Sequence, residues 1–276
     1  PMKAILDKFN LEGETALITG ASGLLGVEHA RALLETGATV VLTDIDKISL
    51  SVVRDGLIKT FGKNRIICKV MDVTNEENIK AVATELASVN VGILINNAAI
   101  DAVPFKKKGA LQRFPTNKMW DDEINVSLKG SFFMIKFFGE EMERRKSGSI
   151  IDIGSDLSVI APNQNIYKSS YDNYIKPVTY SVIKHGMLGL TKYFASLYGK
   201  SNVRVNMVSP GPVHNNQSKK LLNELSNIIP MERLGNPREI LGLLLFFKRS
   251  YPYFVNKYVG RKLLFIVLSQ SIISNS

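Results

Sequence analysis

Cysteine, tryptophan and long apolar runs are scarce in this chain of 276 residues. Its one cysteine, Cys68, excludes an internal disulfide framework and fits a reducing compartment. The longest apolar runs, Ile240–Phe247 and Leu263–Leu268, fall far short of the roughly 20 residues that a membrane span needs. The segment Met2–Phe9 is too polar for a signal peptide. We therefore expect a cytoplasmic protein that has no membrane partner.

Acidic residues are outnumbered by basic ones, which gives a formal net charge of +10. The runs Lys106–Lys108 and Arg144–Lys146 contribute to it, and Lys248–Ser276 contains Lys and Arg but no Asp or Glu. A charge of this kind occurs in nucleic-acid-binding proteins, but no recognised binding motif accompanies it here. We expect a solvated basic surface and no nucleic-acid partner.

Strand and helix patterns alternate along the chain, and no Gly/Ser/Pro linker or internal repeat divides it. The alternation predicts an α/β fold with a doubly wound, Rossmann-type parallel sheet covered by helices on both faces, in three layers. The predicted strands cover residues 15–19, 39–43, 66–70, 92–95, 149–153 and 204–209. Helical patterns cover 27–35 and 119–145, and a third starts at Tyr180. The strand ends fall on the edge where open parallel sheets bind ligands.

A glycine-rich turn follows the first predicted strand. Gly20, Gly23 and Gly26 allow a tight turn, the close approach of a pyrophosphate, and packing of the next helix against the sheet. Asp44 closes the second strand, where its carboxylate can hydrogen-bond both ribose hydroxyls and would repel a 2′-phosphate. Strand, turn, helix, strand and acid in this order predict a dinucleotide site that favours NAD over NADP.

Tyr180 and Lys184 stand four residues apart in a predicted helix, so their side chains share one helical face. An ammonium beside a phenol favours the phenolate and lowers the phenol pKa from about 10 toward neutrality. Such a phenol can move a proton to or from a carbonyl or alcohol oxygen. Taken alone, the same spacing is also typical of an ordinary surface helix.

Further polar residues follow other predicted strands. Asp72 and Val73 come after the third strand and could border an adenine. Asn97 and Ala98 follow the fourth strand and suit either the close approach of a ligand or a structural turn. Asn125 lies inside a predicted helix, where asparagine has no propensity reason to occur. It is therefore either functional or simply an exposed or backbone-bonded residue.

Taken together, residues 11–247 resemble the single-domain form of the short-chain dehydrogenase/reductase family. The residues that carry the resemblance are, in family order, Thr19-Gly20…Gly26, Asp72, Asn96-Asn97-Ala98, Asn125, Ser155, Tyr180…Lys184, Arg204-Val-Asn206 and Pro210-Gly211. The resemblance implies that Tyr180 is the catalytic acid/base and that Lys184 lowers its pKa and holds the nicotinamide ribose. It also implies that Ser155 hydrogen-bonds the substrate oxygen and that Asn125 supports a water-mediated proton relay.

The cofactor site follows from the glycine turn and the resemblance together. Its expected members are Gly20, Ser22, Gly23, Leu25, Gly26, Asp44, Asp72, Val73, Asn97, Ala98, Tyr180, Lys184, Pro210, Gly211 and Val213. The last three would flank the nicotinamide. No metal site is expected.

The chain departs from the family pattern in its glycine turn and near its catalytic residues. The usual turn is T-G-x-x-x-G-x-G, but here Gly23 is the middle glycine and Leu24 occupies the usual place, as in the larger, extended branch of the family. Leu24 must therefore not crowd the pyrophosphate. Ser155 and Tyr180 also stand further apart than usual. The extra segment, Pro162–Pro177, is rich in Tyr and Asn and should form an enlarged loop over the substrate pocket.

The resemblance stops after Phe247, which divides the chain into a catalytic domain, 1–247, and an atypical tail, 248–276. The abrupt loss of pattern and the change in composition suggest a frameshifted reading frame, and genuine divergence is the alternative. In the family the last strand closes a sheet edge and contributes to a subunit interface. The resemblance therefore implies a homodimer or homotetramer, and the tail leaves this assembly open. Leu263–Leu268 could substitute for the missing strand.

The leading functional hypothesis is an NAD(H)-dependent oxidoreductase that interconverts a secondary alcohol and a ketone. Hydride would pass between the nicotinamide and carbon while Tyr180 handles the proton of the oxygen. The polar insertion favours a carbohydrate-like small molecule as substrate. The stretches Lys176–His185 and Glu28–Ala32 resemble bacterial members associated with surface-polysaccharide and flagellin-glycan synthesis. The alternative is a catalytically impaired dinucleotide-binding or scaffold protein with a disrupted C-terminus.

Overall fold

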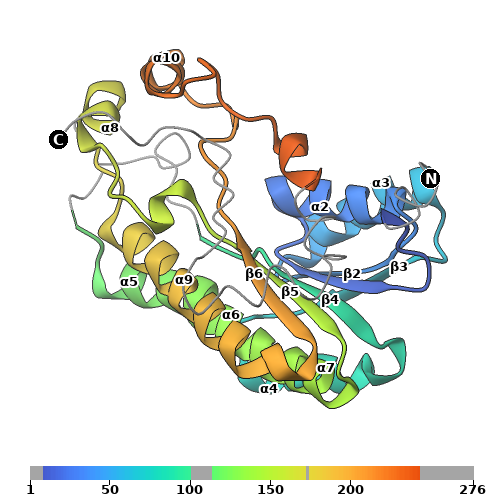
Figure 1. Ribbon diagram of the computed structural model, residues 1–276. Coiled ribbons are helices and arrows are strands. Elements are labelled where there is room, and N and C mark those ends of the chain that lie inside the picture. The colour runs from blue at the N-terminus through green and yellow to red at the C-terminus, as the bar shows by residue number, and fades with distance from the viewer. Residues whose placement is uncertain (1–8, 101–113, 172–173, 243–276) are drawn as a thin grey trace, which may run out of the picture.

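Six parallel strands form one sheet in the order β3-β2-β1-β4-β5-β6 (Figure 1). The computed structural model describes residues 9–100, 114–171 and 174–242. The strands are β1 (Thr15–Thr19), β2 (Thr39–Asp44), β3 (Ile66–Val70), β4 (Val91–Asn96), β5 (Gly148–Ile153) and β6 (Val203–Val208). The doubly wound fold predicted from the sequence is thereby confirmed. The strand order reverses between β1 and β4, which places the ligand-binding switch point at their carboxyl ends.

Helices cover both faces of the sheet. α2 (Leu24–Glu35) and α3 (Lys47–Phe61) lie on one face, while α4 (Glu76–Glu85) and α9 (Val178–Tyr198) lie on the other (Figure 1). Side chains alternate across each strand, so β1 contributes to two cores. Ile18 packs in the cluster that contains Leu33 of α2, whereas Leu17 packs in the cluster that contains Phe194 of α9. Helix α2 begins at Leu24, one turn before the predicted start, because the glycine turn leads directly into it.

The pattern over 119–145 forms one continuous helical rod with two π-helical segments. Its parts are α5 (Asn117–Ile124), η4 (Asn125–Lys129), α6 (Gly130–Met134), η5 (Ile135–Gly139) and α7 (Glu140–Arg145). The first π segment begins at Asn125, the residue that the sequence singles out. Single-turn π segments in longer helices are frequent at functional sites.

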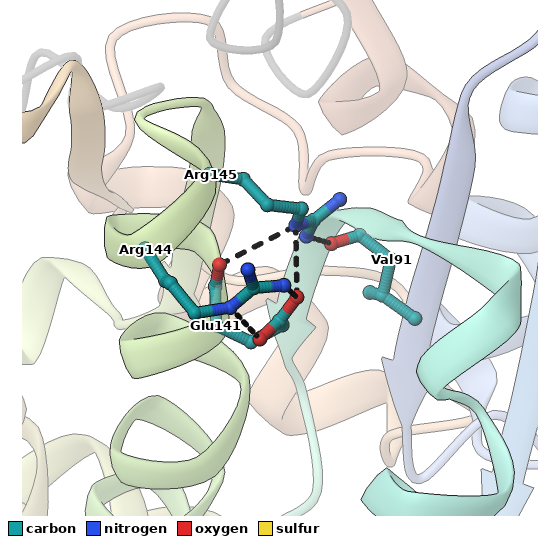
Figure 2. A network of polar contacts seen from close by, with 4 residues as sticks. All are labelled: Val91, Glu141, Arg144 and Arg145. Atoms are coloured by element: carbon teal, nitrogen blue, oxygen red, sulfur yellow. Dashed lines mark hydrogen bonds and ion pairs between the residues drawn. The ribbon is translucent and has the colours of Figure 1, made fainter.

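The basic run Arg144–Lys146 fixes the end of this rod to the sheet (Figure 2). Arg145 Nη2 donates to the carbonyl oxygen of Val91 at 2.6 Å, at the start of β4. Arg144 Nε and Nη2 donate to the two carboxylate oxygens of Glu141 at 2.9 and 2.6 Å. Arg145 therefore links the rod to the sheet at the edge opposite the strand carboxyl ends, whereas Arg144 pairs within its own helix.

The inserted segment between Ser155 and Tyr180 contains helix α8 (Gln164–Ser170), which packs against α10 (Lys219–Ile228) (Figure 1). The enlarged loop that the sequence predicts is thus partly helical. Asn163 caps α8 by accepting from the backbone N–H of Asn165 at 3.1 Å. Ile166 of α8 and Leu221, Leu225, Ile229 and Leu234 form a small apolar cluster between the two helices.

Some sequence-based predictions fall outside the described residues. They concern the basic run 106–108, the atypical tail 248–276 and the substitute strand 263–268.

Two short helical elements, η6 (Asp156–Ser158) and η8 (Pro237–Ile240), follow β5 and α10. No helix in the described part of the chain is long and apolar enough to cross a bilayer.

Candidate active site

The glycine turn after β1 requires its glycines for different reasons. Gly20 has φ +62, and a Cβ there would lie 2.9 Å from Cα of Ala98. A Cβ at Gly26 would overlap the carbonyl oxygen of Gly20. A Cβ at Gly23 would meet only that same oxygen, at 3.3 Å. The side chain of Leu24 is 45% exposed. The turn therefore closes on itself at Gly20 and Gly26 and remains open at Gly23.

Asp44 lies against this turn. Ser22 donates to Oδ2 of Asp44 through both its backbone N–H, at 3.1 Å, and its Oγ, at 2.5 Å. The backbone N–H of Asp46 donates to Oδ1 at 3.1 Å. These bonds hold a carboxylate at the end of β2, beside the N-terminus of α2.

The end of β4 is fastened to the same turn by Asn97. Its side-chain amide donates to the carbonyl oxygens of Thr19 and Gly20, each at 3.0 Å. The backbone N–H groups of Asn97 and Ala98 both donate to Oγ1 of Thr19 at 3.0 Å. Asn97 thus has a structural role in the turn, and it also lines the cavity described next, so its contact with a ligand stays a prediction.

A cavity of about 450 Å³ opens at the carboxyl ends of β4, β5 and β6. Ser155, Tyr180 and Lys184 all line it, so the structure brings together three of the four predicted catalytic residues. Pro210, Gly211 and Val213 line the same cavity from the segment after β6, and Leu25 lines it from α2. Residues far apart in the sequence therefore face one space beside the glycine turn.

Within this cavity, Lys184 is anchored by the sheet. It is buried, and its Nζ donates to the carbonyl oxygen of Ile153 at the end of β5, at 2.8 Å. The same Nζ lies 5.7 Å from the ring centroid of Tyr180. Ser155 caps η6 from the position before it. Its Oγ accepts from the backbone N–H of Leu157 at 3.2 Å and donates to Oδ1 of Asp156 at 2.8 Å.

Asp72 and Val73 follow β3 at the same edge of the sheet. Oδ1 of Asp72 accepts from the backbone N–H and the hydroxyl of Thr74 at 2.8 and 2.7 Å. Val73 packs against the helical rod, since a Cβ at Gly130 would lie 2.9 Å from Cγ2 of Val73. Both residues are fixed by their surroundings at the place where the sequence predicts the adenine.

A family model for enoyl-(acyl carrier protein) reductase matches residues 20–255. The chain belongs to the short-chain dehydrogenase/reductase family. The match ends at residue 255, within the tail 248–276.

Relatives of this short-chain dehydrogenase/reductase include two named enzymes that are 30% identical to it. The 3-oxoacyl-[acyl-carrier-protein] reductase FabG of Thermotoga maritima aligns over 247 residues, 86% of this chain and 90% of the relative. The 2-dehydro-3-deoxy-D-gluconate 5-dehydrogenase of Bacillus subtilis aligns over 261 residues, 92% of this chain and 94% of the relative. A short-chain dehydrogenase of Leptospira borgpetersenii, solved with bound NAD+, is 26% identical with a TM-score of 0.77 and 91% coverage of both chains. The chain is accordingly an oxidoreductase of the class that acts on CH–OH groups.

Asn125 lies in the helical rod rather than among the residues that line the cavity. Its carbonyl oxygen accepts the π-type bond from the backbone N–H of Gly130. Ser127, in the same π segment, does line the cavity and is buried. The π segment thus displaces the backbone of the rod beside the site, and the role of Asn125 in a proton relay stays a prediction.

A buried carboxyl group lies behind Lys184. Oδ1 of Asp152 in β5 accepts from the side-chain amide of Asn96 at 2.8 Å, and Oδ2 accepts from the hydroxyl of Thr191 in α9 at 2.7 Å. Burial raises the pKa of Asp152 to about 6, while the two hydrogen bonds and the positive charge of Lys184 oppose this rise. Asp152 was not predicted as a site residue, because a polar residue inside a buried strand carries no local signal of its partners.

Replacing this carboxyl group should stabilise the protein. Because the pKa of Asp152 is about 6 in the folded state and 3.8 as its reference value, the folded state binds more protons between these values, and stability falls as pH rises through them. Asp152→Asn removes this loss and should raise the free energy of unfolding by up to about 3 kcal/mol above pH 6. The amide can donate to Thr191, whose hydroxyl also donates to the carbonyl oxygen of Met187 at 2.9 Å.

Denaturant unfolding at pH 4 and pH 7 measures this effect. The gain should be small at pH 4 and full at pH 7. Asp121→Asn removes a charge from an exposed position and serves as the matched control. A variant Asp152→Asn that is less stable than the wild type at pH 7 would contradict the prediction.

Two charged residues of the cavity were not predicted as site residues. Lys176 lines the cavity four residues before Tyr180, and Asp156 follows Ser155 directly. Burial raises the pKa of Asp156, while the bond from Ser155 and the nearby charge of Lys176 act to lower it. The one signal in the sequence was spacing: Lys176 stands four residues before Tyr180, and Lys184 stands four residues after it.

Proposed function

We propose that this short-chain dehydrogenase/reductase is an NAD(H)-dependent enzyme that interconverts a secondary alcohol and a ketone. The observation that carries the proposal is the meeting of Ser155, Tyr180 and Lys184 in one cavity that also borders the segment Pro210–Val213. The Leptospira relative, solved with NAD+, supports a nicotinamide dinucleotide as the cofactor.

The residues present fit such a cofactor. Gly20 closes the turn with a positive φ, and in the described structure no side chain caps the N-terminus of α2, so its first N–H groups can receive a pyrophosphate. Asp44 would hold the adenosine ribose, with Asp72 and Val73 beside the adenine. Ala98, Pro210, Gly211 and Val213 would border the remainder of the cofactor.

The chain's own residues supply the proton chemistry, while the nicotinamide supplies or accepts the hydride. Tyr180 donates a proton to the ketone oxygen in reduction and receives it back in oxidation. Lys184 favours the phenolate and binds the nicotinamide ribose. Ser155 orients the substrate oxygen, for which its hydroxyl must leave Asp156. Asn125 supports the relay of the proton to solvent.

The substrate we propose is a polar, carbohydrate-like molecule, of the kind used in surface-polysaccharide or flagellin-glycan synthesis. Five of the side chains that line the cavity carry amide or phenol groups: Asn163, Tyr167, Tyr174, Asn215 and Gln217. The Bacillus subtilis relative, named for a deoxygluconate, supports this class. The Thermotoga relative and the apolar side chains that α10 adds, Leu221 and Leu225, favour an acyl thioester as the second candidate.

A substrate panel separates these candidates. Initial rates with NADH should be measured on ketoses, keto sugar acids and 3-oxoacyl thioesters, with kcat/KM as the criterion. A preference of more than about tenfold for the acyl thioesters would reject the carbohydrate proposal. Normal NADH binding without turnover of any of them would favour the catalytically impaired alternative.

The carboxylate of Asp44 should make NADH bind more tightly than NADPH. It lies beside the glycine turn, where a 2′-phosphate would meet a like charge, and the turn contains no arginine. We expect at least about a tenfold difference in dissociation constant, which Asp44→Ala should narrow. Asp44→Asn removes the charge but keeps an oxygen for Ser22, so it separates repulsion from support of the turn. Equal affinities in the wild type would contradict the assignment.

The predicted homodimer or homotetramer also remains a proposal. Apolar side chains on neighbouring helices are exposed, among them Trp120 of α5, Phe132 of α6, and Val182 and Leu197 of α9. Burying such residues against a second subunit would remove them from water. Light scattering of the full chain measures the number of subunits in this assembly.

The cytoplasmic location expected from the sequence also stays a prediction.

A further inference from the structure

A second buried lysine lies closer to the ring of Tyr180 than Lys184 does. Nζ of Lys176 is 3.9 Å from the ring centroid, compared with 5.7 Å for Nζ of Lys184. Lys176 is only 9% exposed, and it lines the cavity together with Ser155 and Tyr180. The roles assigned above make no use of this ammonium group, which belongs to the inserted segment rather than to the family pattern.

The inserted segment holds Lys176 by its backbone. The side chain of Gln164, the first residue of α8, accepts from the backbone N–H of Lys176 at 2.8 Å and donates to its carbonyl oxygen at 3.1 Å. Helix α8 is in turn fixed to the start of α10, because the backbone N–H of Ser218 donates to the hydroxyl of Tyr171 at 3.0 Å. Pro177 then restricts the chain directly before α9. The position of Lys176 is therefore built by several contacts.

An ammonium over an aromatic face interacts differently with the two forms of a phenol. It attracts the neutral ring through the quadrupole, and this attraction is worth about 2 kcal/mol or less for a partly desolvated pair. It attracts the phenolate more strongly, because a full negative charge is then present. The difference between the two forms favours loss of the phenolic proton, and burial of Lys176 limits screening by water.

We propose that Lys176 is a second ammonium that stabilises the phenolate of Tyr180, and that Gln164 of α8 holds it in place. The catalytic meaning of this step rests on the proposed function, in which Tyr180 is the acid/base. In this proposal Lys176 acts on the substrate only through Tyr180: its positive charge stabilises the phenolate, and it does not touch the substrate itself.

Other groups around the pair set the size of the effect. Among the described residues, the charged and titratable side chains come from α9, η6, β5, α5 and the insertion: Lys184, Asp156, Asp152, Glu123, Tyr167 and Tyr174. Asp156 carries the opposite charge near Lys176 and offsets part of its field. A full opposite charge at such a distance moves a pKa by about 1–3 units, so we expect about one unit for Lys176.

The decisive experiment titrates Tyr180 in the full chain without substrate. Ultraviolet phenolate absorbance is recorded against pH, and each background is compared with its own Tyr180→Phe partner, which isolates this tyrosine from the others. In Lys176→Met the Tyr180 transition should move up by about one pH unit. Lys176→Arg, which keeps the charge, should stay near the wild type. Lys192→Met removes a charge from an exposed position of α9 and should cause no shift.

An unchanged Tyr180 transition in Lys176→Met would overturn the proposal, and so would an equal shift in Lys192→Met. A changed KM for anionic substrates with an unchanged transition would also overturn it, because Lys176 would then bind the substrate. If Lys176→Met does not fold by circular dichroism, Gln164→Leu replaces it. This variant keeps the lysine but loses its anchor, and it should still show a smaller upward shift. Because the titration needs no turnover, a shift in an inactive enzyme would count against the proposed function alone.

Discussion

Tyr180→Phe should reduce kcat by about a hundred- to ten-thousand-fold, which is the range that a positioned general acid/base contributes. The substitution removes one oxygen and with it the transferable proton. The ring, which is half-buried in the cavity, remains in place, so the packing of α9 should be conserved. Binding of NADH should change little, because Lys184, the residue proposed to hold the nicotinamide ribose, keeps its bond to the carbonyl oxygen of Ile153.

The measurement combines steady-state rates with a fluorescence titration of NADH. Tyr193→Phe is the matched control, because Tyr193 lies on the same helix with 63% of its surface exposed. It should leave both quantities unchanged. If Tyr180→Phe kept substantial activity, Tyr180 would not be the acid/base and the proposed function would lose its central residue.

The strands β1, β2, β4, β5 and β6 were predictable from sequence because they are buried on both faces. A parallel strand such as Val91–Asn96 reads as a short apolar run, and its polar end marks the carboxyl edge of the sheet. The glycine turn was predictable from the spacing of its glycines after the first strand, and Gly20 has the positive φ that favours glycine. Its close contact with Ala98, by contrast, joins distant segments and was not predictable. Predictions succeeded where a residue's surroundings follow from its neighbours in the chain.

The features that the sequence did not reveal depend on contacts between distant segments. Asp152 meets Asn96 and Thr191 only in the folded sheet and helix. Helix α8 is stabilised by its apolar contacts with α10, which lies some fifty residues later in the chain. The burial of His29 in α2 has a comparable origin: the side chain is fully buried, and burial lowers its pKa to about 3. No pattern around these residues indicates what covers them.

The site shows the same division. The order of motifs along the chain identified Ser155, Tyr180 and Lys184, and the structure places them around one cavity. The charges in that cavity could not be predicted from the sequence. The insertion brings Lys176 to the ring of Tyr180, and η6 brings Asp156 to the hydroxyl of Ser155. Fold and family thus followed from local motifs, whereas the electrostatic surroundings of the proposed acid/base required the tertiary structure.

Lys184→Met should impair turnover and NADH binding together. The variant removes the ammonium proposed to favour the phenolate of Tyr180 and to bind the ribose, and it leaves the carbonyl oxygen of Ile153 without this donor. We expect kcat/KM to fall by about a hundred- to ten-thousand-fold and the dissociation constant of NADH to rise by at least about tenfold. Lys192→Met, on the exposed face of the same helix, should alter neither. Retention of tight NADH binding would refute the ribose assignment.

Stability gives this variant a second, independent readout. The positive charge of Lys184 lowers the pKa of buried Asp152, which burial otherwise raises, so removing the lysine leaves a buried carboxylate less compensated. Lys184→Met should therefore lose more stability at pH 7 than at pH 4. At pH 7, Asp152→Asn should stabilise the Lys184→Met variant by more than it stabilises the wild type, because the two residues are coupled and their effects will not add. Activity should stay low in the double variant, since neutralising Asp152 returns no cation to Tyr180. Additive stability changes in the double variant would show that Lys184 and Asp152 act independently.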